Sequence, residues 1–132
     1  MTIFLDASYL LALYNENDVH HKRATLIAEK IDANEYEQPL TSDDVFDEVV
    51  SVALRKFGKE KAQTFGKQIL DSVPIVHGDK HLFNNAFAIF NTSKAHFSFT
   101  DCMSQAVMEL AQIHSIATFD KLFETLPVEV VR

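Results

Sequence analysis

Short apolar runs that alternate with helix-like segments constrain the fold of this chain most strongly. The run TIFL at residues 2–5 is β-branched and aromatic and stops at Asp6, as a buried parallel strand does. Segments with helical spacing fill the intervals between the runs. This βαα, βαα, βαα, β, β order predicts an α/β fold with a mostly parallel sheet and helices on both faces. The other expected strands are the run around Pro39 and Leu40 and residues 73–77, 115–119 and 128–131.

Apolar spacing and end signals place the helices. Val45, Val49 and Val52 recur at i, i+4 and i+7, which is one face of a helix, and Gly58 ends that pattern. The N-terminal cap of this helix is expected at Ser42 or Asp43. The remaining helices are expected after Ser8 and over residues 19–31, 59–70, 79–93 and 101–113.

Length and composition indicate one globular unit. A chain of 132 residues has the size of a single domain, which we expect over residues 1–132. The apolar run at residues 9–14 is far shorter than the roughly 20 residues that cross a bilayer. No basic segment precedes an apolar run near the start, and the lone Cys102 favours a reducing compartment. We therefore expect a cytoplasmic protein without membrane contact.

The net charge of −7 argues against a broad basic surface for nucleic acid. Residues 55–67 are a local exception, because they contain five Lys and Arg residues and one Glu, a net charge of +4. A solvated helix pair is the simpler explanation of such a run. The candidate nucleic-acid contacts within it are Arg55, Lys56 and Lys59.

Four carboxylates are expected at the edge of the sheet where ligands bind in parallel α/β folds. Asp6 and Asp120 each follow a predicted strand, Asp101 opens a helix, and Glu48 lies about two turns into the helix after the second strand. Taken singly, Asp101, Glu48 and Asp120 also fit ordinary surface roles. Asp6 differs because a charge beside the core costs stability unless it is paired or bound to a metal.

Close carboxylates repel one another, and a divalent cation relieves that repulsion. Mg²⁺ and Mn²⁺ prefer oxygen ligands, and a metal-bound water can attack a phosphodiester. Hydroxyls flank three of the acids at Ser8, Thr100 and Thr118, where they could position the water or the phosphate. Helix capping and strand propensity explain these hydroxyls equally well.

These residues carry a resemblance that covers nearly the whole chain in order. LDAS at 5–8, TSDDVFDEVV at 41–50, FSFTDCMSQAVM at 97–108 and ATFDKLF at 117–123 resemble the PIN-domain ribonucleases, and most of all the VapC-type toxins of toxin-antitoxin pairs. The resemblance implies an αβα sandwich around a five-stranded parallel sheet. It also implies an endoribonuclease that needs Mg²⁺ or Mn²⁺, a small antitoxin partner and a homodimer. The residues that match the catalytic and metal-binding acids of the family are Asp6, Glu48, Asp101 and Asp120, and Ser8 matches its usual hydroxyl.

Other interpretations remain open at this point. A PIN-type nuclease could process RNA without an antitoxin, and the fold could have kept only a binding role. Receiver domains, which accept phosphate on an Asp, are also small parallel α/β proteins, but here the middle strand ends without an acid. The six histidines lack zinc-ligand spacing. The phenylalanines at 83, 87, 90, 97 and 99 are expected in the core because their spacing is that of packing.

Overall fold

Five parallel strands form one sheet in the computed structural model, which describes residues 2–132, and their order is β3-β2-β1-β4-β5. The first strand lies at the centre and its neighbours come from distant parts of the sequence. This order differs from the 2-1-3-4-5 order of receiver domains. The strands are β1 (Thr2–Leu5), β2 (Gln38–Ser42), β3 (Ile75–Val76), β4 (Ser115–Ala117) and β5 (Glu129–Val131).

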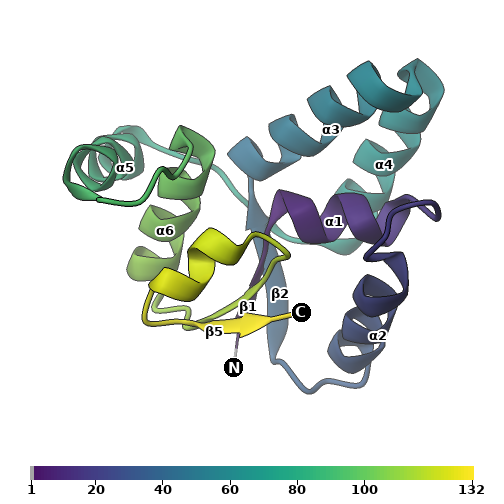
Figure 1. Ribbon diagram of the computed structural model, residues 1–132, viewed down its shortest axis with the longest axis horizontal. Helices are drawn as coiled ribbons and strands as arrows, with labels where there is room; N and C mark the ends of the chain where they lie inside the picture. Colours follow the sequence, from purple (N-terminus) through teal and green to yellow (C-terminus); the bar gives the residue numbers. More distant parts are fainter. Residues whose placement is uncertain (1) are drawn as a thin grey trace.

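Helices cover both faces of the sheet, so the expected αβα sandwich is confirmed (Figure 1). Helices α3 and α4 pack together as one pair, and α5 and α6 pack together as another. None of the helices within residues 2–132 is long and apolar enough to cross a membrane. The helices are α1 (Ala7–Tyr14), α2 (His21–Asp32), α3 (Asp43–Phe57), α4 (Lys59–Ser72), α5 (Lys80–Thr92) and α6 (Phe99–Ala111), with a short 3₁₀ helix, η1, at Lys121–Thr125.

Helix α3 has both of the ends that its sequence predicts. The Ser42 hydroxyl accepts a hydrogen bond from the Val45 N–H, so Ser42, not Asp43, is the cap. At the other end Gly58 has a φ of 91°, a conformation that glycine adopts without the steric cost of a Cβ. Val45 and Val49 are buried as expected. These ends fix how α3 leaves the sheet and therefore where its first turns point.

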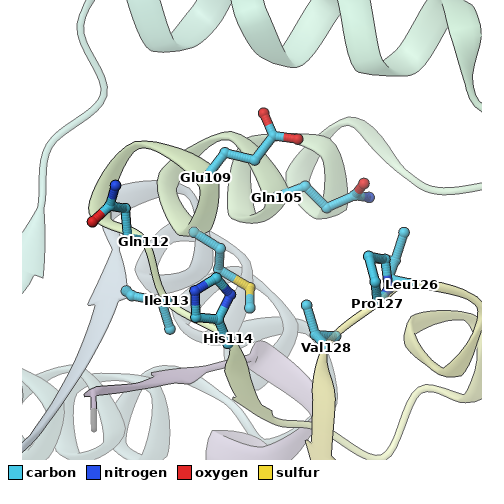
Figure 2. Close-up of a pocket in the computed structure, with 9 residues that line it drawn as sticks. Gln105, Glu109, Gln112, Ile113, His114, Leu126, Pro127 and Val128 are labelled. Carbon is cyan, nitrogen blue, oxygen red and sulfur yellow. The ribbon is translucent and has the colours of Figure 1, made fainter.

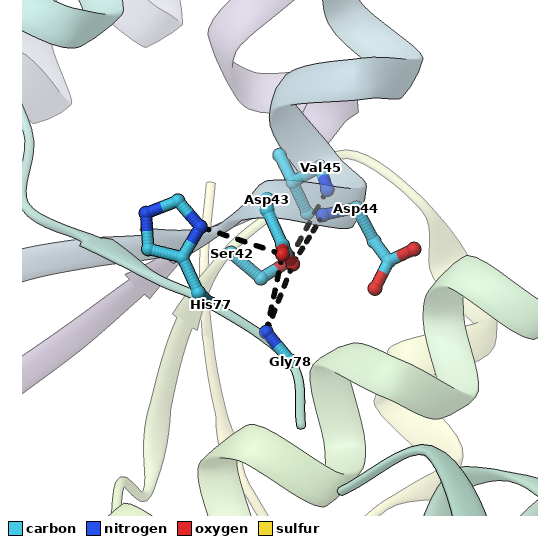
Figure 3. A network of polar contacts seen from close by, with 6 residues as sticks. All are labelled: Ser42, Asp43, Asp44, Val45, His77 and Gly78. Atoms are coloured by element: carbon cyan, nitrogen blue, oxygen red, sulfur yellow. Dashed lines mark hydrogen bonds and ion pairs between the residues drawn. The ribbon is translucent and has the colours of Figure 1, made fainter. Parts of the chain in front are cut away.

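The edge strand β3 is shorter than expected, with two residues instead of five. It pairs with the last two residues of β2. Beyond the strand, the side chain of Asp43 binds the backbone N–H of Gly78 (Figure 3). The Gly78 N–H donates to both carboxylate oxygens of Asp43 at 3.1 and 3.3 Å, and the His77 ring lies 3.5 Å from the same side chain. After β3 ends, a side chain thus takes the place of backbone hydrogen bonds between strands. Strand β4 is also shorter than expected, with three residues instead of five.

The expectation that the phenylalanines at 83, 87, 90, 97 and 99 belong to the core is confirmed for Phe97, which is buried, and is wrong for the three on α5. Phe83, Phe87 and Phe90 are exposed, whereas Leu82 and Ala86 are buried against the rest of the protein. Helix α5 is apolar around more than one side, and only one side can face α6. Apolar spacing alone could not tell which side remained uncovered.

Candidate metal centre

The four predicted carboxylates line one pocket of about 320 Å³. Asp6 follows β1, Glu48 lies on α3, Asp101 lies on α6, and Asp120 follows β4 by two residues. The elements that carry them meet because β4 pairs with β1, while α3 contacts both α1 and α6. The structure thus brings together residues that are up to 114 positions apart.

Asp6 is the most deeply buried of these acids, with an exposed fraction of 4 %. Its Oδ2 atom accepts hydrogen bonds from the Thr118 hydroxyl at 2.7 Å and from the Ser8 hydroxyl at 2.9 Å. Burial raises the pKa of Asp6, while these two hydrogen bonds lower it in part. The hydroxyls therefore favour the ionised carboxylate at a place where burial disfavours it.

Ser8, which lines the pocket, and the buried Thr118 form a pair of hydroxyls beside Asp6 that we call the polar lock. Their hydroxyl oxygens lie 3.1 Å apart, and Ser8 also accepts a hydrogen bond from the Phe119 N–H at 3.0 Å. Thr118 accepts one from the Asp120 N–H at 3.0 Å. Because Thr118 is fully buried, its hydroxyl faces these protein groups and not a molecule in the pocket. The hydrogen bonds of the polar lock thus hold the Asp6 carboxylate close to the backbone of Asp120.

Asp101 does not open its helix, contrary to the expectation. Helix α6 begins at Phe99, with Ser98 as its cap and Asp101 in the third helical position. The Ser98 hydroxyl accepts from the Asp101 N–H, and the Asp101 carboxylate accepts from the Ser98 N–H, each at 3.1 Å. This reciprocal capping box aims Asp101 at the pocket. Sequence reasoning missed Ser98, although the pattern Ser-x-x-Asp before an apolar helix is its usual signal.

Glu48 is half-buried and lines the pocket, so it does not have the ordinary surface role that it also fitted when taken singly. Burial raises its pKa, and the negative charges of Asp6 and Asp101 raise it further, while Arg55 lowers it. Asp101 likewise has a pKa raised by burial and by the charge of Asp6. The carboxylates of the pocket therefore interact electrostatically with one another.

Asp120 and Thr100 differ in how they meet the pocket. Asp120 lines it, and one of its carboxylate oxygens accepts a hydrogen bond from the Leu122 N–H at 2.9 Å, which caps η1. Thr100 does not line the pocket, and its backbone carbonyl accepts a hydrogen bond from Ser104. The pocket walls also include Leu11 and Val52, so one side of it is apolar.

The donor set fits a hard divalent cation. All four acids offer oxygen, and no His or Cys lines the pocket, which favours Mg²⁺ or Mn²⁺ over zinc. Three of the acids have raised pKa values, which is the electrostatic cost that a cation would relieve. Among residues 2–132, no three His, Cys, Asp or Glu side chains are already gathered closely enough to hold an ion. A cation would therefore draw the carboxylates together or reach some of them through water, as Mg²⁺ often does.

A second hollow of about 330 Å³ lies away from these acids, between α6 and the segment that leads into β5 (Figure 2). Its walls are largely apolar, and Glu109 is its only carboxylate among the described residues. The side-chain amide nitrogen of Gln105 is buried there without a hydrogen-bond partner. This chemistry does not suit a metal ion, so the acidic pocket is the candidate metal centre.

Comparisons with known proteins agree with this geometry. The toxin VapC20 of Mycobacterium tuberculosis, described as cleaving the sarcin-ricin loop, is 26 % identical, with a TM-score of 0.83 over 96 % of this chain and 98 % of that one. VapBC2 of Rickettsia felis bound to promoter DNA is 13 % identical, with a TM-score of 0.74 over 98 % and 97 % of the two chains. A toxin-antitoxin complex of Klebsiella pneumoniae is 18 % identical, with a TM-score of 0.72 over 98 % and 96 %.

Curated protein sequences gave no match. The family model of the PIN domain, in contrast, matches residues 3–129. The resemblance to VapC-type PIN proteins is thereby confirmed, and the receiver interpretation falls away. The chain belongs to the PIN domain family.

Proposed function

We propose that this protein is a metal-dependent endoribonuclease that acts as the toxin of a toxin-antitoxin pair. The observation that carries the proposal is the convergence of Asp6, Glu48, Asp101 and Asp120 on one pocket, where burial and mutual repulsion raise the pKa values of three of them. Such a cluster destabilises the metal-free protein, and a bound cation would relieve the repulsion between the carboxylates. Membership of the PIN family and the likeness to VapC20 support the nuclease.

The four acids would hold Mg²⁺ or Mn²⁺ in this mechanism. A bound divalent cation supplies a water of lowered pKa and neutralises charge that develops on the phosphate. Ser8 and Thr118 hold the Asp6 carboxylate in place and favour its ionised form, so Asp6 is the fixed ligand. Asp101 is aimed by its capping box, whereas Glu48 reaches the pocket on a longer, adaptable side chain. The hydroxyls therefore position a carboxylate, and this proposal replaces a direct role for Thr118 in holding water or phosphate.

Arg55 is the leading candidate for contact with the RNA backbone. It lies two turns after Glu48 on α3, roughly 10 Å along the helix axis. Helical side chains lean toward the N-terminus, so we expect the Arg55 side chain to lean back toward the pocket. Its effect on the pKa of Glu48 agrees with that direction. Lys56 and Lys59 are exposed and extend the positive charge beyond it.

The partners follow from the same proposal. Structurally similar chains include toxin-antitoxin complexes, which supports a small antitoxin as the partner of this chain. We also infer a homodimer, as the resemblance implies, and a cytoplasmic location. The alternative is an RNA-processing PIN nuclease without an antitoxin. An adjacent small reading frame that encodes a DNA-binding protein would favour the toxin.

The test of the proposed function is cleavage of a mixed RNA pool by the purified protein. We expect cutting with Mg²⁺ or Mn²⁺ and none with a chelator. Cutting that persists in chelator contradicts metal dependence. If a verified folded protein cuts no RNA with either metal, the binding-only interpretation gains the support.

A further inference from the structure

Two aromatic rings from distant parts of the chain stack face to face beside the acidic pocket. The rings of His20, directly before α2, and Phe119, two residues after β4, have centroids 4.4 Å apart and planes 7° apart. Phe119 is half-buried, whereas His20 is exposed. Because Phe119 covers one face of the His20 ring, the exposure of His20 leaves the opposite face for another flat molecule.

This stacked pair is tied to the wall of the acidic pocket. The Phe119 N–H donates to the Ser8 hydroxyl at 3.0 Å, and Ser8 lines the pocket. Asp120, the residue after Phe119, lines the pocket as well. The stacked pair therefore stands just outside the pocket, one residue away from a proposed metal ligand.

The turn before α2 holds His20 in place. The Asp18 carboxylate accepts a hydrogen bond from the His20 N–H at 2.8 Å, and the Asp18 carbonyl accepts one from the His21 N–H at 3.0 Å. The Nδ1 atom of His21 lies 2.8 Å from the Ala12 carbonyl, which joins this turn to α1. The His20 ring is thus presented in one place, and a ligand would not have to order it first.

The charge beside the stacked pair suits RNA. Residues 20–23 read HHKR, a basic run in a chain whose net charge is −7, and the Lys22 and Arg23 side chains are exposed. Surfaces for single-stranded nucleic acid combine such cations with aromatic rings on which bases stack. Bases are free to stack on a protein where they are unpaired, as in loops and single strands. The ligand that fits is therefore an unpaired stretch of RNA.

We propose that His20, supported by Phe119, stacks on an unpaired RNA base next to the phosphate that is cut. A base held there fixes the strand beside Ser8 and Asp120 at the wall of the pocket. The stacked pair thereby helps to select which phosphodiester bond reaches the acids. This inference rests on the proposed function, in which RNA is the substrate.

The experiment measures, by fluorescence anisotropy, how two probes bind to the cleavage-deficient Asp101→Asn protein, which is the parent for all variants. One probe is a single strand of about twelve adenosine nucleotides, a length that such surfaces cover. The other is a ribose-phosphate chain of the same length without bases. We expect His20→Ala to weaken binding of the adenosine probe by roughly 5- to 150-fold, as for the loss of one stacked base. Binding of the baseless chain should not change.

Three further variants make the test specific to stacking. His20→Tyr should restore binding of the adenosine probe, because a tyrosine ring can also lie between Phe119 and a base. Phe119→Leu should weaken it, because leucine cannot support the His20 ring by stacking. His114→Ala is the matched control, since His114 is exposed and precedes β4, at the other end of that strand from Phe119. It should bind both probes as the parent does, and thermal unfolding verifies that each variant folds.

Three results would overturn the proposal: a parent that does not bind the adenosine probe, a folded His20→Ala variant that binds it as well as the parent, or an equal loss for both probes. An equal loss would report charge and not a base. Failure of the proposed function differs from these results, because the wild type with Asp101 intact would then cut no RNA with either metal. If the wild type cuts RNA and His20→Ala leaves binding of the adenosine probe unchanged, this inference alone fails.

Discussion

The hydroxyl of Thr118 donates a 2.7 Å hydrogen bond to Oδ2 of Asp6 across 112 residues of sequence. Parallel pairing makes this contact possible, because Leu5 lies opposite Ala117 and the Asp6 N–H donates to the Ala117 carbonyl. The strand ends thus deliver a carboxylate and its supporting hydroxyl to the same point. A buried carboxylate with such support stays closer to its ionised form than burial alone would allow.

Thr118→Val removes this hydroxyl at nearly constant volume. We expect it to destabilise the protein by about 1.5–3 kcal/mol, which is typical for a hydrogen bond to a charged group. Cleavage or metal affinity should fall by roughly 10–100-fold, as for residues that orient metal ligands. Urea unfolding and a Mn²⁺ titration measure the two effects.

Thr64→Val is the matched control for this variant. Thr64 is exposed on α4, and its hydroxyl donates only to the Glu60 carbonyl. It should change stability little and leave cleavage at the wild-type level. Wild-type cleavage and metal affinity in Thr118→Val would show that the lock does not position Asp6.

Ser98→Ala tests the capping box of α6. Loss of an N-cap hydroxyl costs about 1 kcal/mol. Asp79→Ala removes the cap of α5, whose side chain accepts from the Leu82 N–H, and should cost a similar amount. Of these two variants, Ser98→Ala alone should also reduce cleavage, because Ser98 holds an acid of the pocket and Asp79 does not. Equal cleavage by the two variants would reduce Ser98 to an ordinary helix cap.

Repulsion within the pocket predicts how stability depends on pH. The pKa values of Glu48 and Asp101 are raised in the folded state, mainly by burial. Below their unfolded pKa both states are protonated, so no penalty exists. As pH rises toward the folded pKa, only the unfolded state releases its protons, and stability falls. Asp101→Asn and Glu48→Gln should therefore stabilise the metal-free protein at neutral pH, and this gain should shrink at acidic pH.

Thermal unfolding in chelator at several pH values measures this gain. Asp47→Asn is the control, because Asp47 is exposed on α3 beside Glu48 but does not line the pocket. It should show no comparable gain. A loss of stability in Asp101→Asn at neutral pH would mean that capping outweighs repulsion.

Arg55→Gln should weaken binding of RNA to the cleavage-deficient Asp101→Asn background by roughly 10-fold. The slope of log affinity against log salt should drop by about one, as when a phosphate contact is lost. Lys56→Gln, one residue further along α3, is the control and should have the smaller effect. Fluorescence anisotropy at several salt concentrations measures both. Equal losses would show that general positive charge, and not the lean of Arg55 toward the pocket, attracts the RNA.

Local signals allowed much of this architecture to be predicted. Ser42 and Gly58 mark the two ends of α3, Ser42 by capping and Gly58 by its backbone conformation. Both signals depend on a few neighbouring residues. Asp6 could be identified because a charge directly after an apolar strand is costly. The Ser98 cap also has a local signal, the Ser-x-x-Asp spacing from Ser98 to Asp101.

Features that depend on tertiary contacts could not be predicted in the same way. The lock between Ser8 and Thr118 joins residues 110 positions apart, so no spacing in the sequence indicates it. The exposure of Phe87 depends on which side of α5 meets α6. Beyond the short strand β3, the Gly78 N–H donates to Asp43, a contact between residues 35 positions apart.

The central claim is that four carboxylates act together as one cation site. The most direct measurement is Mn²⁺ affinity by calorimetry, with RNA cleavage measured in parallel, for Asp6→Asn, Glu48→Gln, Asp101→Asn and Asp120→Asn beside Asp47→Asn. We predict that each of the four pocket variants loses affinity and cleavage together while Asp47→Asn retains both. If the folded pocket variants bound Mn²⁺ and cut RNA as well as Asp47→Asn does, the acidic pocket would not be the metal centre.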